Sequence, residues 1–261
     1  MIQLKTSKPK MIRFLNISLL GGLITKAVAK VSTTVEKKVI VEVTDKSLQT
    51  VIMWAKFKDG YFPKMTYDNG ETLQISDSIH KAIKKIGASD ITLEENNQLV
   101  TAAGTSFKYE ESEQDLKFSE IDVEELSSDD ETQTYFRPKM IDTSADVLEF
   151  QVFTDTEELR KLPQADKYTF VLDKGELKVV TEDVGKLEID INCSSTSAEG
   201  DLDLKYTKSF SGDIFNKLIS NLDGKVVIEF SQKFLILSQS NKEVDLMYAQ
   251  ASLVDSSTVT V

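Results

Sequence analysis

Side chains that could carry catalysis or bind a metal are scarce in this sequence. It contains one histidine, His80, and one cysteine, Cys193, in 261 residues. His/Cys metal clusters need several such ligands, and a Ser-His or Cys-His pair would have to be built on His80. The sequence also lacks a phosphate-binding glycine loop and any CxxC, HExxH or EF-hand spacing. We therefore expect no catalytic residue, no metal and no cofactor, and a protein that is not an enzyme.

Charge is unevenly distributed along the chain. Between Glu110 and Glu131 there are eleven acidic residues and one basic residue, Lys117, so this stretch carries −10 of the formal net charge of −12. Acid/base catalysis by paired carboxylates requires environments that separate their pKa values, and this exposed pattern is typical of a solvated segment instead. The rest of the chain is close to neutral, so it can present basic surfaces that bind nucleic acid.

Basic residues recur on four short segments with helical spacing. In 77–86, Ile79, Ala82, Ile83 and Ile86 form one apolar face, with Ser76 as N-cap and Gly87 as C′ residue. The segment 213–222 has the same spacing in Phe215, Leu218, Ile219 and Leu222, while 155–162 ends at Pro163 and 9–20 places Ile12, Leu15 and Leu19 inward. We interpret His80 as part of the basic stripe of 77–86. Basic side chains on these helices are Lys8, Lys10, Arg13, Lys81, Lys84, Lys85, Arg160, Lys161 and Lys217.

Most of the remaining sequence consists of short β-rich runs separated by turn signals. With 40% hydrophobic and 28% charged residues, the chain has a globular composition and can build a sizeable core. The predicted strands are 38–44, 48–57, 91–93, 148–153, 168–172, 177–181, 187–192, 226–230 and 234–238.

Two of the helical segments are related by a constant offset of 136 residues. Ile79 corresponds to Phe215 and Ile86 to Leu222, and the register continues from Ile91 to Val227. An offset near half the chain length indicates two copies of one module, joined by the acidic stretch near 110–135. The alternative is a coincidence between two amphipathic helices that each precede strands.

The first thirty residues resemble a secretory signal peptide. Lys5, Lys8, Lys10 and Arg13 precede an apolar run, and Ala27-Val28-Ala29 resembles a cleavage site. Asn16 and Ser18 interrupt the run, and Gly21-Gly22 end it, so we favour a retained segment. No other stretch is long and apolar enough to span a bilayer.

Three segments resemble the two-domain sliding clamps of DNA replication, the proliferating cell nuclear antigen (PCNA) type. Ile121-Asp122-Val123-Glu124-Glu125-Leu126 looks like the start of the family's interdomain connector loop. The run 73–99 is similar to the family's second helix and following hairpin, and Leu246-Met247-Tyr248-Ala249-Gln250-Ala251 resembles its C-terminal strand. The residues that carry the similarity in 73–99 are Ser76, Lys81, Ile83, Lys84, Gly87, Asp90, Ile91, Thr92, Leu93 and Asn96.

The resemblance weakens at three places. Residues 21–44 match poorly, Ser252 stands where the family commonly has proline, and the tail 256–261 is not acidic. These departures indicate a divergent clamp, for example one from a virus, a phage or an archaeon.

The resemblance implies an α+β fold of two similar domains, each with antiparallel β-sheets and two short helices. The expected divisions are an N-terminal domain 1–118, a connector 119–136 and a C-terminal domain 137–261. Three subunits would form a pseudo-six-fold ring around duplex DNA, with the nine basic residues above facing the phosphates without reading sequence. The resemblance further implies that such a homotrimer would work inside the cell with the replicating DNA, as a processivity factor for DNA polymerase, and that a clamp loader would be among its partners.

The resemblance also implies a pocket for a partner peptide beneath the connector. The matching positions are Thr44, Leu48, Leu126, Tyr135, Tyr248, Ala249, Gln250, Ala251, Ser252 and Leu253. Alternatively, Leu126 and Tyr135 only pin the connector to the sheet. Ring closure would pair an edge near Tyr109–Lys117 of one subunit with Leu187–Ser194 of the next.

Two other interpretations stay open. A heteromeric or monomeric clamp-like processivity or checkpoint subunit would share the fold without forming a homotrimer. A secreted β-rich structural or adhesion protein would begin near Val31 and would not affect DNA.

Overall fold

The computed structural model describes most of the chain, which divides into two compact units. Residues described are 2–32, 37–44, 51–67, 71–94, 98–101, 106–108, 118, 120–128, 133–139, 148–181, 186–197 and 205–253. Unit 1 comprises Met1–Asp45, Met53–Ile121 and Asn241–Leu246. Unit 2 comprises Lys46–Ile52, Asp122–Ser240 and Met247–Val261. Strands β4 (Val51–Phe57) and β20 (Val244–Ala251) each carry residues of both units.

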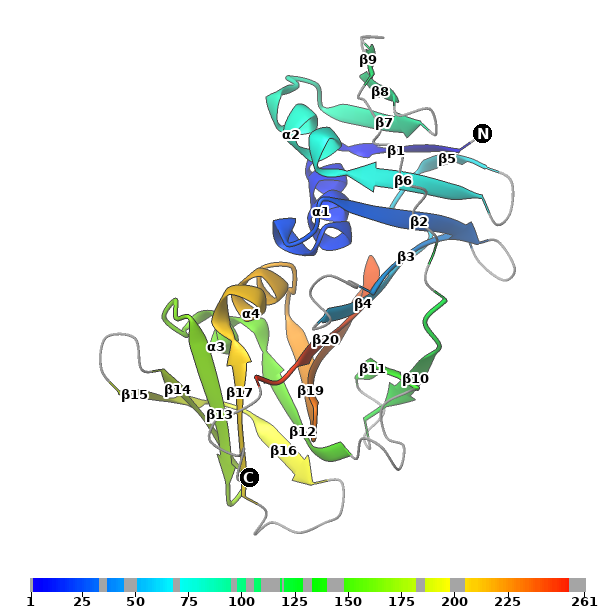
Figure 1. The fold of residues 1–261 in the computed structure, drawn as a ribbon. Coiled ribbons are helices and arrows are strands. Elements are labelled where there is room, and N and C mark those ends of the chain that lie inside the picture. The colour runs from blue at the N-terminus through cyan, green and yellow to red at the C-terminus, as the bar shows by residue number, and fades with distance from the viewer. Residues whose placement is uncertain are drawn as a thin grey trace, which may run out of the picture. The chain divides into compact units, whose positions relative to one another are not determined.

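Unit 1 is built from antiparallel strands and two α-helices (Figure 1). Besides β4, its elements are β1 (Gln3–Ser7), α1 (Lys8–Ser18), η1 (Leu20–Gly22), β2 (Lys26–Ser32), β3 (Lys38–Thr44), β5 (Lys64–Thr66), β6 (Thr72–Ser76), α2 (Asp77–Lys85), β7 (Asp90–Glu94), β8 (Gln98–Thr101) and β9 (Ser106–Lys108). The strands form a sheet of order β5-β1-β7-β8-β9 and a run of order β4-β3-β2-β6.

Unit 2 repeats this plan after a two-stranded hairpin. The hairpin consists of β10 (Val123–Ser127) and β11 (Thr134–Pro138). The elements that follow, before β20, are β12 (Leu148–Asp155), α3 (Thr156–Arg160), β13 (Lys167–Asp173), β14 (Glu176–Thr181), β15 (Leu187–Ile191), β16 (Ser194–Ser197), β17 (Tyr206–Ser211), α4 (Gly212–Ile219), β18 (Lys225–Ser231) and β19 (Phe234–Ser240). Their orders are β16-β12-β18-β19-β20 and β15-β14-β13-β17.

The two units therefore match strand for strand and helix for helix. Replacing β5, β1, β7, β8 and β9 by β16, β12, β18, β19 and β20 converts the first sheet order of unit 1 into that of unit 2. The same holds for β4, β3, β2 and β6 against β15, β14, β13 and β17. The predicted internal duplication is thus present, and it includes every α-helix in the described residues.

The repeat is offset by 135 residues at the second helix of each unit, one fewer than the sequence pattern indicated. Ser76 is the N-cap of α2 and Ser211 is the N-cap of α4. Each pairs with the first residue of the neighbouring strand, Lys26 in β2 and Lys167 in β13. Strand pairing therefore places the equivalence one residue away from the alignment that the sequence pattern indicated.

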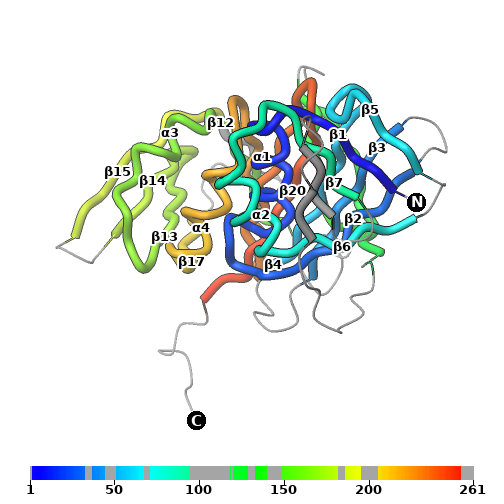
Figure 2. The backbone as a smooth tube through the Cα atoms, turned by 90° about the horizontal axis from the view of Figure 1, so that it is seen from above, coloured from blue at the N-terminus to red at the C-terminus, as the bar shows by residue number. Residues whose placement is uncertain are grey.

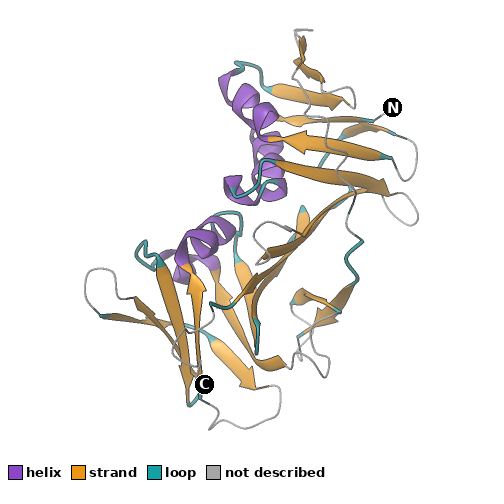
Figure 3. Cartoon of the chain, in the orientation of Figure 1, coloured by secondary structure: helices purple, strands orange, loops and turns teal. Residues whose placement is uncertain are grey.

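Aromatic side chains fill the core of each unit. In unit 1, Phe14 of α1 packs edge-to-face on Phe57 of β4 and on Phe62, with ring centroids 4.9 and 5.2 Å apart. In unit 2, Phe230 of β18 stacks on Phe150 at 4.4 Å, while Phe215 of α4 meets Phe170 at 5.4 Å. Such pairs contribute roughly 0.5–1.5 kcal/mol each beyond area burial. The helices are thereby fixed on the sheets of their own unit (Figure 3).

Local details of the helices differ from the predictions at two points. Helix α1 buries Met11, Phe14, Leu15, Ile17 and Ser18, whereas Ile12, predicted to face inward, is only half-buried. At the end of α2, Gly87 does not take the left-handed backbone of a C′ glycine. The hypothetical cleavage site Ala27-Val28-Ala29 lies in β2 with all three side chains buried. No helix among the described residues meets the length and apolarity needed to cross a membrane.

Candidate nucleic-acid interface

Helix α2 presents the most exposed basic face. Its Ile79 and Ile83 side chains are buried, while Lys81, Lys84 and Lys85 are exposed. Lys81 forms an ion pair with Asp77, one turn earlier, at 2.5 Å, but its side chain remains 72% exposed. Among the described residues, Lys84 and Lys85 have no acidic partner. These two ammonium groups are available to an anionic ligand such as a phosphate backbone.

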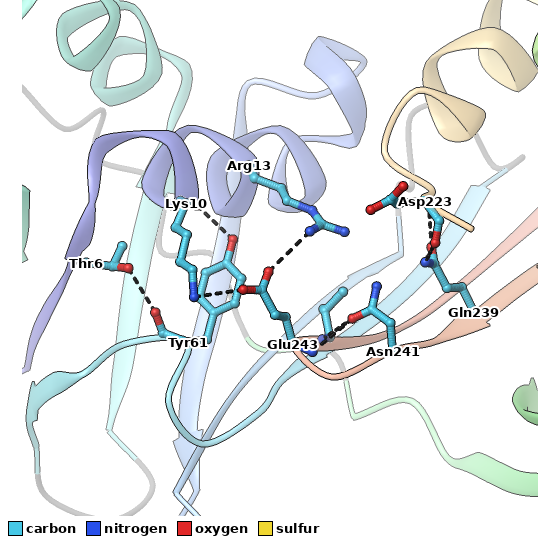
Figure 4. A network of polar contacts seen from close by, with 9 residues as sticks. Thr6, Lys10, Arg13, Tyr61, Asp223, Gln239, Asn241 and Glu243 are labelled. Atoms are coloured by element: carbon cyan, nitrogen blue, oxygen red, sulfur yellow. Dashed lines mark hydrogen bonds and ion pairs between the residues drawn. The ribbon is translucent and has the colours of Figure 1, made fainter. Parts of the chain in front are cut away.

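Helix α1 lies beside α2 in unit 1, and its basic residues are all engaged (Figures 1 and 2). Lys10 binds the Glu243 carboxylate at 2.8 Å, and Arg13 binds the same carboxylate at 3.3 Å (Figure 4). The Lys10 ammonium also lies 5.3 Å from the centre of the Tyr61 ring. Lys8 donates to the carbonyl oxygens of Lys84, at 3.4 Å, and of Ile86.

The hydrogen bonds from Lys8 to the end of α2 have a counterpart in unit 2. Arg160 of α3 donates from Nη2 to the carbonyl oxygen of Leu222 at 2.7 Å. Ile86 and Leu222 both follow the second helix of their unit, where carbonyl groups lack intrahelical partners. In both units a cation from the first helix satisfies these carbonyls, as the negative end of the helix dipole favours. Lys8 and Arg160 therefore hold the helix pair together.

The two remaining predicted DNA-facing residues of unit 2 form ion pairs with nearby residues of the same helical segment. Lys161 contacts Glu158 at 2.5 Å with its side chain 60% exposed, and Lys217 contacts Asp213 at 3.5 Å. The hydrogen bond from Lys161 is the main reason that the pKa of Glu158 is lowered. Exposed pairs of this spacing are weak, so a competing anion can replace the carboxylate.

His80 does not belong to the basic face, contrary to the sequence-based interpretation. Its side chain is only 7% exposed, and Nε2 is buried with no hydrogen-bond partner in the described residues. Burial, followed by the charge of Lys84, lowers the pKa of His80, so the imidazole is neutral at pH 7. Counted from the equivalent N-caps, His80 occupies the position of buried Phe215 in α4.

The connector segment folds as a hairpin attached to unit 2. Leu126 of β10 pairs in register with Tyr135 of β11, whose side chain is 8% exposed. Next to it, the Phe136 amide donates to Ser238 of β19 at 2.6 Å. Arg137 makes two hydrogen bonds to Glu229, a carboxylate that is fully buried in β18. This part of the connector is a fixed element of unit 2.

Residues expected to line the partner pocket fall into two groups. Tyr248, Ala249 and Gln250 are buried in β20, so their side chains are not accessible on the surface. Ala251 and Ser252 are half-buried, and Leu253 is 41% exposed. Backbone hydrogen bonds of 2.7 Å to the Lys233 carbonyl and 2.8 Å to the Ser209 carbonyl fix Ser252 and Leu253 in place. Leu253 therefore offers an exposed apolar side chain on an ordered backbone.

Of the two remaining predicted pocket positions, the structure describes one. Thr44, the last residue of β3 in unit 1, is exposed, while Leu48 lies outside the described residues. Of the segments expected to close a ring, Tyr109–Lys117 also lies outside them. The other, β15, is the edge strand of its sheet, and its Leu187 side chain is 48% exposed.

Three acidic residues that the sequence did not single out organise these surfaces. Glu243 holds Lys10 and Arg13, and Glu229 holds Arg137. Glu42 of β3 is 8% exposed and accepts a 2.9 Å hydrogen bond from the Ile121 amide, just before β10. Burial raises the pKa of Glu42 to about 7, although that hydrogen bond opposes the shift. No local pattern marks them, because each partner comes from a distant part of the chain.

Comparison with known proteins gives a match in structure but not in sequence. No family model matches this chain, and neither does any curated protein. Among solved structures, the chain is similar to the PCNA of A. fulgidus bound to the C-terminal region of FEN-1, with a TM-score of 0.62 and 12% identity. The match covers 98% of this chain and 100% of that one.

The chain has the fold of a PCNA clamp. The predicted α+β architecture of antiparallel sheets with two short helices in each unit is thus confirmed. At this level of identity the similarity establishes the fold alone, because one fold can carry different functions.

Proposed function

We propose that this protein is a sliding clamp that encircles duplex DNA and tethers a DNA polymerase to its template. The observation that carries the proposal is the strand-for-strand repeat of two units in a chain that matches a PCNA over 98% of its length. A clamp works by topological linkage, not catalysis. It raises the effective concentration of the polymerase at the primer end.

Duplex contact would come from the helices. Nine basic residues on or beside them are the proposed DNA-facing set: Lys8, Lys10, Arg13, Lys81, Lys84, Lys85, Arg160, Lys161 and Lys217. Lys84 and Lys85 are the strongest candidates, because they are exposed and have no acidic partner in the described residues. Lysines of this kind neutralise phosphates without reading base edges, which suits a protein that must slide.

Ring formation would require pairing between subunits, and the repeat suggests where. Strands β4 and β20 each extend through residues of both units, and their counterparts are β15 and β9. Among the described strands, β15 and β9 are edges of their sheets. An unpaired edge readily adds a strand from another chain. We propose that β15 of one subunit pairs with the segment at and after β9 of the next, which closes a homotrimer.

Partner proteins would dock near the β10–β11 hairpin and the C-terminal end of β20. The similar A. fulgidus PCNA was determined with the C-terminal region of FEN-1 bound. Here, the half-buried Leu126 of the hairpin and the exposed Leu253 supply apolar contacts of the kind that short peptides use, while Tyr135, which is buried, supports Leu126 in the hairpin. The proposed partners are a DNA polymerase, other proteins with clamp-binding motifs and a clamp loader, at the replicating DNA inside the cell.

Light scattering coupled to size-exclusion chromatography tests the assembly. The chain has a mass of 29.2 kDa, so a closed homotrimer has three times that mass, about 88 kDa. A mass near 88 kDa at micromolar concentration is the expected result. A mass near 29 kDa would contradict the homotrimer and favour a heteromeric or monomeric clamp-like subunit.

A further inference from the structure

Glu243 places a carboxylate on the cations of helix α1. It lies in the turn between β19 and β20, within unit 1, and binds Lys10 at 2.8 Å and Arg13 at 3.3 Å (Figure 4). The turn itself is well fixed. The Asn241 side chain accepts hydrogen bonds from the Glu243 and Val244 amides at 2.9 Å, and the Glu243 carbonyl accepts from the Lys58 amide at 3.0 Å.

This pairing differs from the other ion pairs on the helices. The side chains of Lys10, Arg13 and Glu243 are 36%, 29% and 36% exposed, so all three are substantially shielded from water. By contrast, each of the other helix pairs has one strongly exposed member: Lys81 at 72%, Lys161 at 60% and Asp213 at 73%. Shielded charges interact more strongly and are less screened by salt. Among the ion pairs described on the helices of unit 1, those of Glu243 are thus the hardest for another anion to displace.

The Arg13 guanidinium is only partly satisfied by this arrangement. Its Nη1 contacts Glu243 at 3.3 Å, while its buried Nη2 has no hydrogen-bond partner among the described residues. A guanidinium binds phosphate through two parallel hydrogen bonds, which a phosphate group supplies better than this single long contact. The carboxylate therefore leaves part of the hydrogen-bonding capacity of Arg13 unused.

We propose that Glu243 acts as an intramolecular substitute for a DNA phosphate, occupying Lys10 and Arg13 and thereby weakening duplex binding by α1. This inference rests on the proposed duplex-binding function. A backbone phosphate must displace the carboxylate before it binds either cation. The free energy needed to displace the carboxylate offsets part of the electrostatic attraction between α1 and DNA. The helix therefore holds DNA loosely enough for the protein to move along it.

The test uses the full-length protein and a short fluorescently labelled DNA duplex, with binding measured by fluorescence anisotropy over a salt series. Glu243→Gln keeps the shape but removes the charge. We expect about threefold to tenfold tighter binding at low salt, with a salt slope steeper by about 0.9 for each additional phosphate that the protein neutralises. Glu176→Gln, at an exposed position in β14, changes the net charge equally and should alter binding much less.

Further variants separate this role from a merely structural one. Glu243→Asp keeps the charge and should bind like the parent. In a Lys10→Gln/Arg13→Gln background, Glu243→Gln should have no effect, because the cations it controls are gone. Thermal unfolding identifies any variant that has lost its fold.

Two outcomes would overturn the inference. A folded Glu243→Gln protein that binds the duplex no tighter than the parent contradicts it, as does equal tightening in the background without Lys10 and Arg13. If Lys84→Glu/Lys85→Glu still weakens binding in that case, the proposed function survives and only the role of Glu243 fails. If no variant changes duplex binding at all, the proposed function fails as well.

Discussion

Gly212, the first residue of α4, lies against the carbonyl group of Ala165 in the loop after α3. A methyl group on its α-carbon would stand 1.8 Å from the Ala165 oxygen, much closer than any real contact. The Gly212 amide also donates to the Asp166 carbonyl at 2.8 Å. Only glycine permits this approach, so the close contact between α4 and the loop that follows α3 depends on the glycine at this position.

Gly212→Ala should therefore destabilise unit 2. The added methyl must push the loop away and weaken the Gly212–Asp166 hydrogen bond, which we expect to cost about 2 kcal/mol or more. The control is Gly87→Ala, because a side chain there meets nothing within 4 Å. Urea unfolding measures both variants. Equal stabilities would contradict the close approach.

Arg137 should be essential to the attachment of the connector hairpin. Among the described residues, Arg137→Ala leaves the fully buried Glu229 carboxylate with the 3.0 Å hydrogen bond from Gln151 alone. Removal of one partner of a buried pair costs about 3–5 kcal/mol. The double variant Arg137→Met/Glu229→Leu should regain much of that loss, since it leaves no buried charge. Denaturant titration of the parent and the two variants measures their free energies of unfolding. A loss below about 1 kcal/mol for Arg137→Ala would contradict a structural role for the Arg137–Glu229 pair.

Glu42 should make stability depend on pH. Its pKa is raised to about 7 in the folded chain from an ordinary value of 4.5, chiefly by burial. Between these values the folded state holds a proton that the unfolded state has lost, so the contribution of Glu42 to stability falls as pH rises through this window. Glu42→Gln should therefore be more stable than the parent at pH 8, with a smaller difference at pH 5. Thermal unfolding of the parent and the variant at pH 5 and pH 8 measures the difference in their stability. The same difference at both pH values would contradict titration of Glu42 in this range.

Lys84 and Lys85 should contribute directly to duplex binding. Lys84→Glu/Lys85→Glu removes two exposed cations, so binding to a short duplex should weaken at least about tenfold at low salt, with a shallower salt slope. Lys64→Glu, at an exposed position in β5, makes the same kind of change on a strand and serves as the control. If both proteins lose binding equally, net charge and not the helix face governs the interaction.

The buried faces of the longer amphipathic helices could be predicted from spacing alone. Phe215, Leu218, Ile219 and Leu222 are all buried, as their periodicity indicated. His80 was wrongly assigned, because helical spacing placed it with the lysines opposite the apolar face, whereas its side chain is buried together with those of Ile79 and Ile83. Periodicity locates an apolar stripe but tolerates a shift of one position. Whether a residue at the edge of that stripe is buried depends on how the helix packs in the folded chain.

The charge partners of Arg13 and Arg137 could not be predicted, since they come from distant parts of the chain. Arg13 and Glu243 are 230 residues apart in sequence, and Arg137 and Glu229 are 92 apart. Helical spacing identified Lys10 and Arg13 as outward-facing cations, but it could not indicate that a turn carries a carboxylate to them. The positions of basic residues on the helices were therefore predictable, while their availability to a ligand was not.

Topological linkage to DNA is the central claim, and a threading experiment tests it most directly. A linear duplex is fixed to a bead at one end, incubated with the protein and then blocked at its free end with a bulky group. We predict protein that resists a high-salt wash on this duplex, that is released when the duplex is cut, and that fails to load if both ends are blocked beforehand. Equal retention whether or not an end was open, or complete loss in the high-salt wash, would contradict the account.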